Sequence, residues 1–383
     1  MRHAALIILI DALGWKTIEN RPFLDDLILT RCPLRTVLGF SSGAEPSILT
    51  GKTPAQHGRW TMYKRASSSS PFGLARWLAL YPPALPAAHR IRRFLSWWVR
   101  SREKVAGYFD LYEVPLSLLP NFDLCERGNI FDVGGIPEAP TLFDRLSDQG
   151  IPFRSWSWRT AEAQNWRDLE SAIDRGEPGY YFLYTPALDA LQHSVGTQAP
   201  AVGDLVADYE RRIRAIHDLA VARGLRPVLH IFADHGMKDT LGTADLIAAV
   251  RATGLRMTRD YLAFYDSTMG RFWFFHDDAR DRVTAALRAI PHGRVLDDAE
   301  LAREGVLFGD RRYGETIFLM NPGWQIEPSF MGSRAPRAMH GFHPDDAWSD
   351  AAFLSNHAFE NPPRDIRDLL PILLAAAQRG EGA

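Results

Sequence analysis

The feature that most limits the possible folds is a run of seven apolar residues near the N-terminus, AALIILI at residues 4–10. Apolar and polar residues do not alternate in it, so it predicts a strand buried on both faces, as in the centre of a parallel sheet. The run ends on Asp11. An acidic residue directly after such a strand lies at the carboxyl edge of the sheet, where α/β proteins place their sites. Asp11 is therefore the first candidate site residue.

Strand-like and helix-like segments alternate along most of the 383-residue chain. We expect strands at residues 4–10, 34–38, 152–156, 179–185, 227–233 and 316–320, antiparallel aromatic strands within 261–275, and helices at residues 17–30, 141–149, 161–175, 202–223, 244–252, 277–289 and 365–378. The alternation predicts the α/β class with a largely parallel central sheet. The length fits one large domain over residues 1–383.

Residues 61–140 interrupt this alternation, and we interpret them as a cap inserted within the domain. They include a basic segment, residues 86–104, in which Ile91, Leu95 and Trp98 fall near one helical face and arginines supply positive charge. Two interpretations of the segment stay open. It is either an ordinary cap helix with a solvated face, or a surface for a membrane or an anionic substrate tail.

Charge and cysteine content exclude several classes of protein. A net charge of −2 gives no reason to expect a nucleic-acid polymer as the partner. Cys32 and Cys125 are the only cysteines and do not form a C-x-x-C pair, which argues against a disulfide framework or a thiolate zinc site. The first apolar run has only seven residues and ends on Asp11 with no small-residue cleavage site after it, so we do not expect a signal peptide. No apolar window of about 20 residues predicts a membrane span. We expect a cytoplasmic protein, with possible peripheral membrane contact through residues 86–104.

Residues 40–58, FSSGAEPSILTGKTPAQHG, combine two adjacent serines with a glycine-rich turn. A buried structural loop does not need so many small hydroxylic residues beside glycine, whereas a loop that exposes one hydroxyl to a reagent does. We interpret this stretch as the carrier of a nucleophile, with Ser41 and Ser42 as the two candidates.

Three more groups of ligand-type residues follow expected strands or lie in turns. Asp189 and His193 are four residues apart, a spacing that places a carboxylate and an imidazole on one helical face. The remaining candidates are Asp234 and His235 in FADHGM, and His340 and His343 in MHGFHP. Carboxylates and imidazoles at strand ends, without thiolates, are the ligands of a two-ion hydrolytic centre.

The order of these motifs resembles the alkaline phosphatase superfamily, and most closely its nucleotide pyrophosphatase/phosphodiesterase-like branch. The matching elements are IDALGW, SSGAEPSILTGKTPAQHG, LDALQHSVG, FADHGM and MHGFHP. The resemblance extends from residue 4 to about residue 374, with a poor match across residues 61–140. It implies an alkaline phosphatase-like three-layer α/β/α sandwich with a largely parallel central sheet and an inserted cap.

The resemblance also implies two divalent metal ions, with Zn²⁺ favoured and Mn²⁺ as the alternative. One ion would be held by Asp189, His193 and His340, and the second by Asp11, Asp234 and His235. The nucleophile would bridge the ions or complete the coordination of the second one.

The nucleophile of the superfamily lies nine residues before the Thr of a Thr-Gly pair, which here is Thr50 and indicates Ser41, with Ser42 as its rival. The branch usually has Thr at this position and an Asn three residues later, where this chain has Ala44. The resemblance therefore leaves open which group contacts a phosphoryl oxygen. His343 is a candidate substrate-binding residue, and a turn histidine is an equal alternative.

The expected function is metal-dependent hydrolysis of a phosphate ester, as a phosphodiesterase or phosphatase, through a phosphoserine intermediate. The substrate would be a phosphorylated small molecule, glycan or lipid. The alternatives are a phosphomutase or phosphonate hydrolase of the same superfamily, and a non-catalytic relative that binds lipid or protein.

Overall fold

A six-stranded, largely parallel sheet forms the centre of the larger lobe. The computed structural model describes residues 2–67, 70–78 and 88–378. The strand order is β2-β16-β7-β1-β6-β5, and β16 alone runs antiparallel to its neighbours. These strands are β1 (Arg2–Ile10), β2 (Thr30–Leu34), β5 (Phe153–Trp156), β6 (Gly179–Thr185), β7 (Leu225–Phe232) and β16 (Ala351–Ser355). The run AALIILI is thus a central strand, as expected, and its residues 4–10 are almost fully buried.

Helices cover both faces of this sheet and complete an α/β/α sandwich. In one group α9 (Pro200–Ala222) contacts both α7 (Glu162–Asp174) and α8 (Ala187–Val195). The other contains the mutually contacting helices α2 (Ser41–Thr50), α6 (Leu142–Asp148) and α13 (Leu369–Gln378). The expected fold class is confirmed. The largest hydrophobic core lies between these layers.

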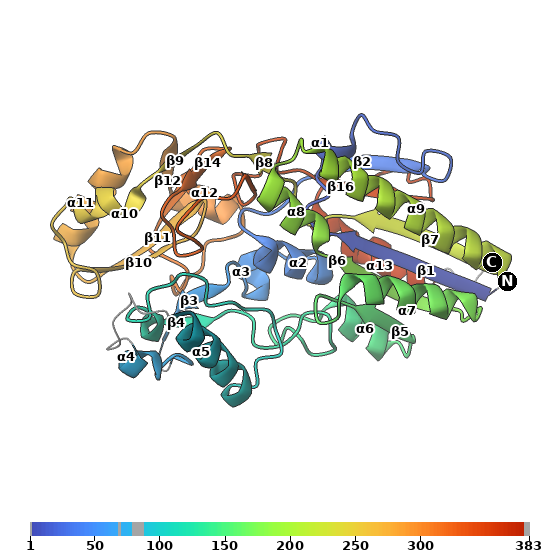
Figure 1. Ribbon diagram of the computed structural model, residues 1–383, viewed down its shortest axis with the longest axis horizontal. Coiled ribbons are helices and arrows are strands. Elements are labelled where there is room, and N and C mark those ends of the chain that lie inside the picture. The colour runs from blue at the N-terminus through green and yellow to red at the C-terminus, as the bar shows by residue number, and fades with distance from the viewer. Residues whose placement is uncertain (1, 68–69, 79–87, 379–383) are drawn as a thin grey trace.

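A second lobe is built on an antiparallel sheet of order β10-β11-β13-β12. Its strands are β10 (Tyr261–Tyr265), β11 (Met269–Phe274), β12 (Gly293–Leu296) and β13 (Thr316–Met320), with helices α10 (Leu246–Arg251) and α11 (Asp277–Arg288) beside them. Figure 1 shows this lobe at one end of an elongated molecule, with both chain termini at the other end.

Residues 61–140 divide between the two lobes. The described part contains β3 (Tyr63–Arg65), α4 (Ala75–Leu78), α5 (Ala88–Arg102) and β4 (Phe122–Leu124), and it shares a hydrophobic core with the antiparallel sheet. Residues 130–139 instead contribute to the core of the central sheet. Residues 68–69 and 79–87 of the expected cap, including the start of the basic segment 86–104, lie outside the described residues. The boundaries of domain and cap stay a prediction.

The remaining elements are short. They are α1 (Trp15–Ile18), α3 (Pro54–His57), α12 (Asp298–Arg303), β8 (Lys238–Asp239), β9 (Gly242–Ala244), β14 (Trp324–Ile326), β15 (Ala338–Met339), and the 3₁₀ turns η1 (Leu119–Asn121) and η2 (Ile366–Asp368). Among the described helices, none has the length and apolarity needed to cross a bilayer.

Two expectations near the N-terminus are wrong. The helix expected at residues 17–30 is limited to α1, because Pro22 cannot continue a helix and Leu24 adopts a positive φ of 53°. The strand expected at residues 34–38 lies earlier, as β2, and contains Pro33. A proline is tolerated there because β2 is an edge strand of the sheet.

Candidate functional site

The carboxyl ends of three adjacent strands bring the expected ligand residues together. Asp11 follows β1, Asp189 and His193 lie on α8 just after β6, and Asp234 and His235 follow β7. Because β1 pairs in parallel with both β6 and β7, these three chain segments leave the sheet at the same edge. The expectation that these residues share one site is therefore supported by their placement.

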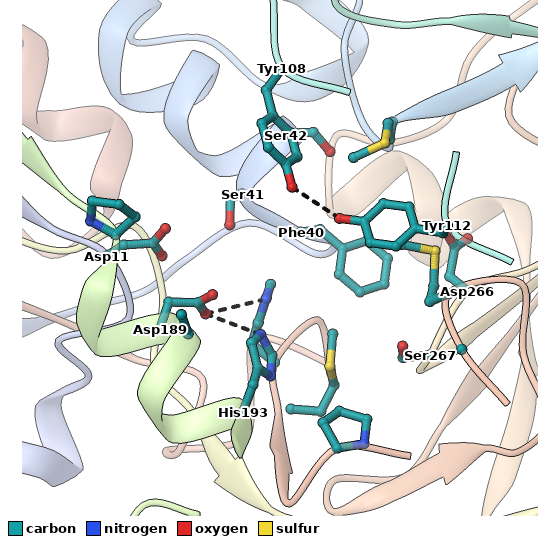
Figure 2. A pocket seen from close by; sticks show the side chains of 18 of the residues that line it. Asp11, Phe40, Ser41, Ser42, Tyr108, Tyr112, Asp189, His193, Asp266 and Ser267 are labelled. Carbon is teal, nitrogen blue, oxygen red and sulfur yellow. Dashed lines mark hydrogen bonds and ion pairs between the residues drawn. The ribbon is translucent and has the colours of Figure 1, made fainter. Parts of the chain in front are cut away.

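Ser41 is the first residue of α2 and faces this edge of the sheet. Its Oγ lies 2.9 Å from Nε2 of His235. A cavity opens beside this edge, and Ser42 also lines it. The Ser42 hydroxyl, however, donates to the carbonyl of Trp60 at 3.2 Å. Figure 2 shows Asp11, Ser41 and Asp189 on one side of the cavity, with Asp266 and Ser267 on the other. Of the two serines, only Ser41 contacts an expected ligand residue through its side chain.

Asp189, His193 and His340 offer ligand atoms that lie within 4.8 Å of one another. His193 Nδ1 lies 2.8 Å from the carbonyl oxygen of Ala338, which can only accept, so this nitrogen carries the hydrogen and Nε2 is free to coordinate. His193 Nε2 is 3.2 Å from Oδ1 of Asp189. His340 follows β15, which pairs with β8 just after His235, and its Nδ1 is buried without a hydrogen-bond partner.

In both Asp11 and Asp234, one carboxylate oxygen accepts hydrogen bonds from the protein and the other accepts none. Tyr184 donates its hydroxyl to Oδ2 of Asp11 at 2.5 Å, and the backbone amides of Ala12 and His235 donate to Oδ1 of Asp234 at 3.3 and 3.0 Å. Oδ1 of Asp11 and Oδ2 of Asp234 are buried without a partner. These two oxygens lie 3.6 and 3.1 Å from Nε2 of His235.

The charges at this edge fit divalent cations. Burial, followed by the charges of Asp234 and Asp189, raises the pKa of Asp11 well above its ordinary value. Burial and the neighbouring His235 lower the pKa of His340, which keeps this imidazole neutral. Buried, unpartnered carboxylate oxygens and neutral imidazole nitrogens are the donors that Zn²⁺ or Mn²⁺ takes. The residues present could therefore hold the two ions that the resemblance implies.

Two residues at this edge were not expected from the sequence. Tyr184, at the end of the aromatic strand, orients Asp11. Glu45 places a carboxylate oxygen within 4.8 Å of oxygens of Asp11 and Asp234. The spacing of four residues between Ser41 and Glu45 could have indicated that both lie on one helical face.

His343 lies apart from the other expected site residues. Its Nε2 is 3.1 Å from Oε1 of Glu300, and its Nδ1 accepts a hydrogen bond from the amide of Asp345 at 3.2 Å. His343 is not one of the described residues that line the cavity beside Ser41. Its placement gives no support to a substrate-binding role.

A cavity of about 610 Å³ opens beside Ser41 and extends between the two lobes. Phe40, Asp189 and Tyr184 line it from the larger lobe, and Met62 and Ile326 from the smaller one. Its other described lining residues include Tyr108, Tyr112 and Trp158; the Tyr108 ring packs edge-on against Trp158, and its hydroxyl lies 3.3 Å from that of Tyr112. The cavity is large enough for a ligand of nucleotide size.

Comparison with known proteins identifies relatives of this chain. A family model described as type I phosphodiesterase / nucleotide pyrophosphatase matches residues 5–343. The solved structure of human ectonucleotide pyrophosphatase/phosphodiesterase 5 has a TM-score of 0.67 and 14% identity, covering 99% of this chain and 95% of that chain. The murine protein gives 0.66 with the same identity and coverage. Its inactive Thr-to-Ala variant, in complex with AMP, gives 0.65 at 15% identity, again covering 99% and 95%. At such identity the likeness shows a common fold. No curated protein sequence matches significantly.

Proposed function

The chain belongs to the type I phosphodiesterase / nucleotide pyrophosphatase family, within the alkaline phosphatase superfamily, and from this we propose that it hydrolyses phosphodiesters at a two-metal site through a phosphoserine at Ser41. Membership supports a phosphodiester hydrolase in general terms. The two ions, the intermediate and the nucleophile are our proposal. Zn²⁺ is the favoured ion, with Mn²⁺ as the alternative.

The observation that carries the proposal is the position of Ser41. Its Oγ lies at the start of a ten-residue helix, 2.9 Å from His235 and beside a cavity of substrate size. A helix N-terminus favours a negatively charged group such as a phosphoryl group, because its free backbone N–H groups and the helix dipole both point toward it. The same residue thus reaches both the ligand cluster and the place where a phosphoryl group would bind.

In the proposed reaction, Ser41 Oγ attacks phosphorus as the bond to the leaving alcohol breaks, and water later breaks the phosphoserine bond. Bound divalent ions would favour the ionised hydroxyl and offset charge on the phosphoryl oxygens. Tyr184 holds Asp11 in place, and the backbone amides of Ala12 and His235 hold Asp234. These contacts fix the ligand oxygens before substrate arrives, which reduces the reorganisation that the reaction requires.

The cavity favours a diester over a monoester. A diester carries a second organic group, and the cavity wall beyond Ser41 contains aromatic and apolar side chains, among them Tyr108, Trp158 and Ile326. The inactive variant of the murine relative was solved with AMP, a molecule in which an aromatic base is attached to a phosphorylated sugar. We therefore place a phosphorylated small molecule, with a nucleotide as one candidate, in this cavity.

The membrane contact expected for residues 86–104 is retained as a proposal. On α5, Phe94 and Trp97 are 47% and 62% exposed. Arg90 and Arg93 on the same helix are also exposed. An exposed aromatic pair beside positive charge supports contact with an anionic surface.

The test of the proposed nucleophile compares Ser41→Ala with Ser42→Ala on bis(p-nitrophenyl) phosphate. Ser41→Ala should lower kcat at least about 1000-fold, because the covalent route is lost. It should still bind two ions per chain, because the six carboxylate and imidazole ligands are unchanged. Ser42→Ala should keep at least about a tenth of the activity, because its hydroxyl bonds to a backbone carbonyl instead.

Full activity of Ser41→Ala would refute the assignment. Inactivity of Ser42→Ala with an active Ser41→Ala would transfer the role to the rival serine. Wild-type protein that binds two ions but cleaves only phosphonates would support the phosphonate hydrolase alternative. Transfer of a phosphoryl group between alcohols would support the phosphomutase alternative.

A further inference from the structure

Glu45 is a buried carboxylate on the same helix as the proposed nucleophile. It is 8% exposed and lies four residues after Ser41 in α2, so both side chains are on one face of the helix. One of its oxygens lies within 4.8 Å of an oxygen of Asp11 and of an oxygen of Asp234. Three acidic side chains from two adjacent strands and one helix thus converge on one small volume.

This cluster also has unsatisfied donor atoms that point to a cation. Asp11 and Asp234 are 4% and 0% exposed, and each has one buried carboxylate oxygen without a hydrogen-bond partner. Within the described part of the chain, Asp11 and Asp234 form ion pairs with His235, and no Lys or Arg pairs with either of them or with Glu45. Buried carboxylates are stable when they are paired, hydrogen-bonded or bound to a metal ion. A cation is the partner that this arrangement lacks.

We propose that Glu45 is a third carboxylate ligand of the ion held by Asp11, Asp234 and His235. The inference rests on the proposed function, because it assigns a further ligand to one of its two ions. The two sites then differ in chemistry. The carboxylates of Asp11, Glu45 and Asp234 would hold one ion, with the imidazole of His235, which lies beside Asp11 and Asp234, as its fourth donor. The site of Asp189 offers one carboxylate and two imidazoles.

A difference in ion preference follows from these donor sets. Oxygen ligands suit Mn²⁺, while imidazole ligands suit Zn²⁺. Removing the Glu45 carboxylate should therefore weaken Mn²⁺ binding more than Zn²⁺ binding at the same site.

The experiment measures ion binding by the full chain without substrate. Protein stripped with a chelator is titrated with Mn²⁺, with free Mn²⁺ followed by electron paramagnetic resonance, and with Zn²⁺ against a chromophoric chelator. Wild type should bind two ions per chain. Glu45→Gln, which keeps the shape but loses the charged donor, should weaken one of the two Mn²⁺ sites at least about 100-fold and leave the other within about threefold.

Glu126→Gln is the matched control, because Glu126 is a second buried carboxyl in the wall of the same cavity but outside the ligand cluster. It should change both Mn²⁺ affinities less than about threefold, since it removes negative charge without removing a ligand. Glu45→Asp retracts the carboxylate and should weaken the same single site about tenfold. It also keeps the test decisive if Glu45→Gln does not fold.

Two ions bound to Glu45→Gln with wild-type affinity would overturn the inference and leave the proposed function intact. Equal losses in Glu45→Gln and Glu126→Gln would also overturn it, because the effect would then be one of charge and not of ligation. A wild-type chain that binds no ion would overturn the proposed two-metal function together with this inference.

Discussion

Among single residues, Glu126 gives a pH-dependent prediction that does not depend on metal ions. Its carboxyl is 7% exposed, and burial raises its pKa to about 7 against the partial opposition of Arg59. The folded chain therefore holds this proton more tightly than the unfolded chain. The stabilising effect is complete below the unfolded pKa of 4.5 and is lost as the pH rises through about 7.

Glu126→Gln removes this titration. The free energy of unfolding of the variant, relative to wild type, should rise by about 3 kcal/mol between about pH 4.5 and about pH 8.5. Urea unfolding of metal-free protein across this range measures the difference. The same substitution at Glu170, which is exposed on α7, should leave the difference flat. A flat difference for Glu126→Gln as well would show that the buried carboxyl does not titrate as stated.

For single residues, the sequence predicted the candidate ligands better than it predicted the neighbouring residues Glu45 and Tyr184. Asp11 and Asp234 stand directly after expected strands and Asp189 four residues after one, so parallel pairing brings them to one edge. Glu45 and Tyr184 were missed because their roles depend on how α2 and β6 approach that edge, which is set by tertiary packing. His343 shares a motif with His340, yet a turn between them directs it toward Glu300.

At the scale of elements, the turn after β7 depends on a glycine with no room for a side chain. A Cβ on Gly236 would lie 2.1 Å from the carbonyl oxygen of Trp348 and 2.8 Å from that of Asp350. The Gly236 amide also donates to the carbonyl of Ser349 at 2.9 Å, which ties the turn to the segment before β16. The position of His235 follows directly from this close approach of two backbones.

Gly236→Ala should therefore destabilise the fold by about 1–3 kcal/mol, because backbone atoms must move apart. It should also lower kcat/KM at least about tenfold, because the ligands of this turn move with the backbone. Urea unfolding and diester hydrolysis measure the two effects. Gly309→Ala is the control, since a Cβ there meets no atom within 4 Å. Wild-type stability and activity of Gly236→Ala would contradict the role given to this turn.

The elements themselves were predicted where hydrophobic periodicity was strong. The strand expected at 179–185 and the helix expected at 161–175 agree with β6 and α7 within one residue at each end. The helix expected at 17–30 was wrong because its apolar spacing suggested a helix that Pro22 does not permit. Hydrophobic periodicity indicates which side chains are buried, whereas the backbone restriction at Pro22 decides that this segment is not one long helix.

For the molecule as a whole, the cavity beside Ser41 is formed by two lobes whose association could not be predicted from the sequence. The second hydrophobic core combines described residues from two segments, 63–124 and 244–330, which are far apart along the chain. Sequence patterns mark the first of these segments as unusual but contain no signal for its partner. The sheet edge with the candidate ligands belongs to the larger lobe, while much of the cavity wall belongs to the smaller one.

This division predicts that the smaller lobe can be changed to alter substrate choice without altering the chemistry. Ala335 lines the cavity, and its backbone amide is held by Glu327 Oε2 at 2.6 Å, a contact that a larger side chain leaves in place. Ala335→Trp should fill part of the space for the second ester group. It should lower kcat/KM for bis(p-nitrophenyl) phosphate at least about tenfold, while methyl p-nitrophenyl phosphate, which has the same leaving group, changes less than about threefold.

Ser333→Trp provides the matched control, because Ser333 is exposed two residues earlier in the same loop and does not line the cavity. It should leave both rates near those of wild type. An equal loss for both diesters in Ala335→Trp would mean that the substitution disturbs the ligands at Ser41 and Asp189 instead of the wall. Unchanged rates for both diesters would place the second ester group outside this cavity, and the smaller lobe would then not select the substrate. A selective loss for the larger diester would assign selection to the smaller lobe and catalysis to the edge of the central sheet.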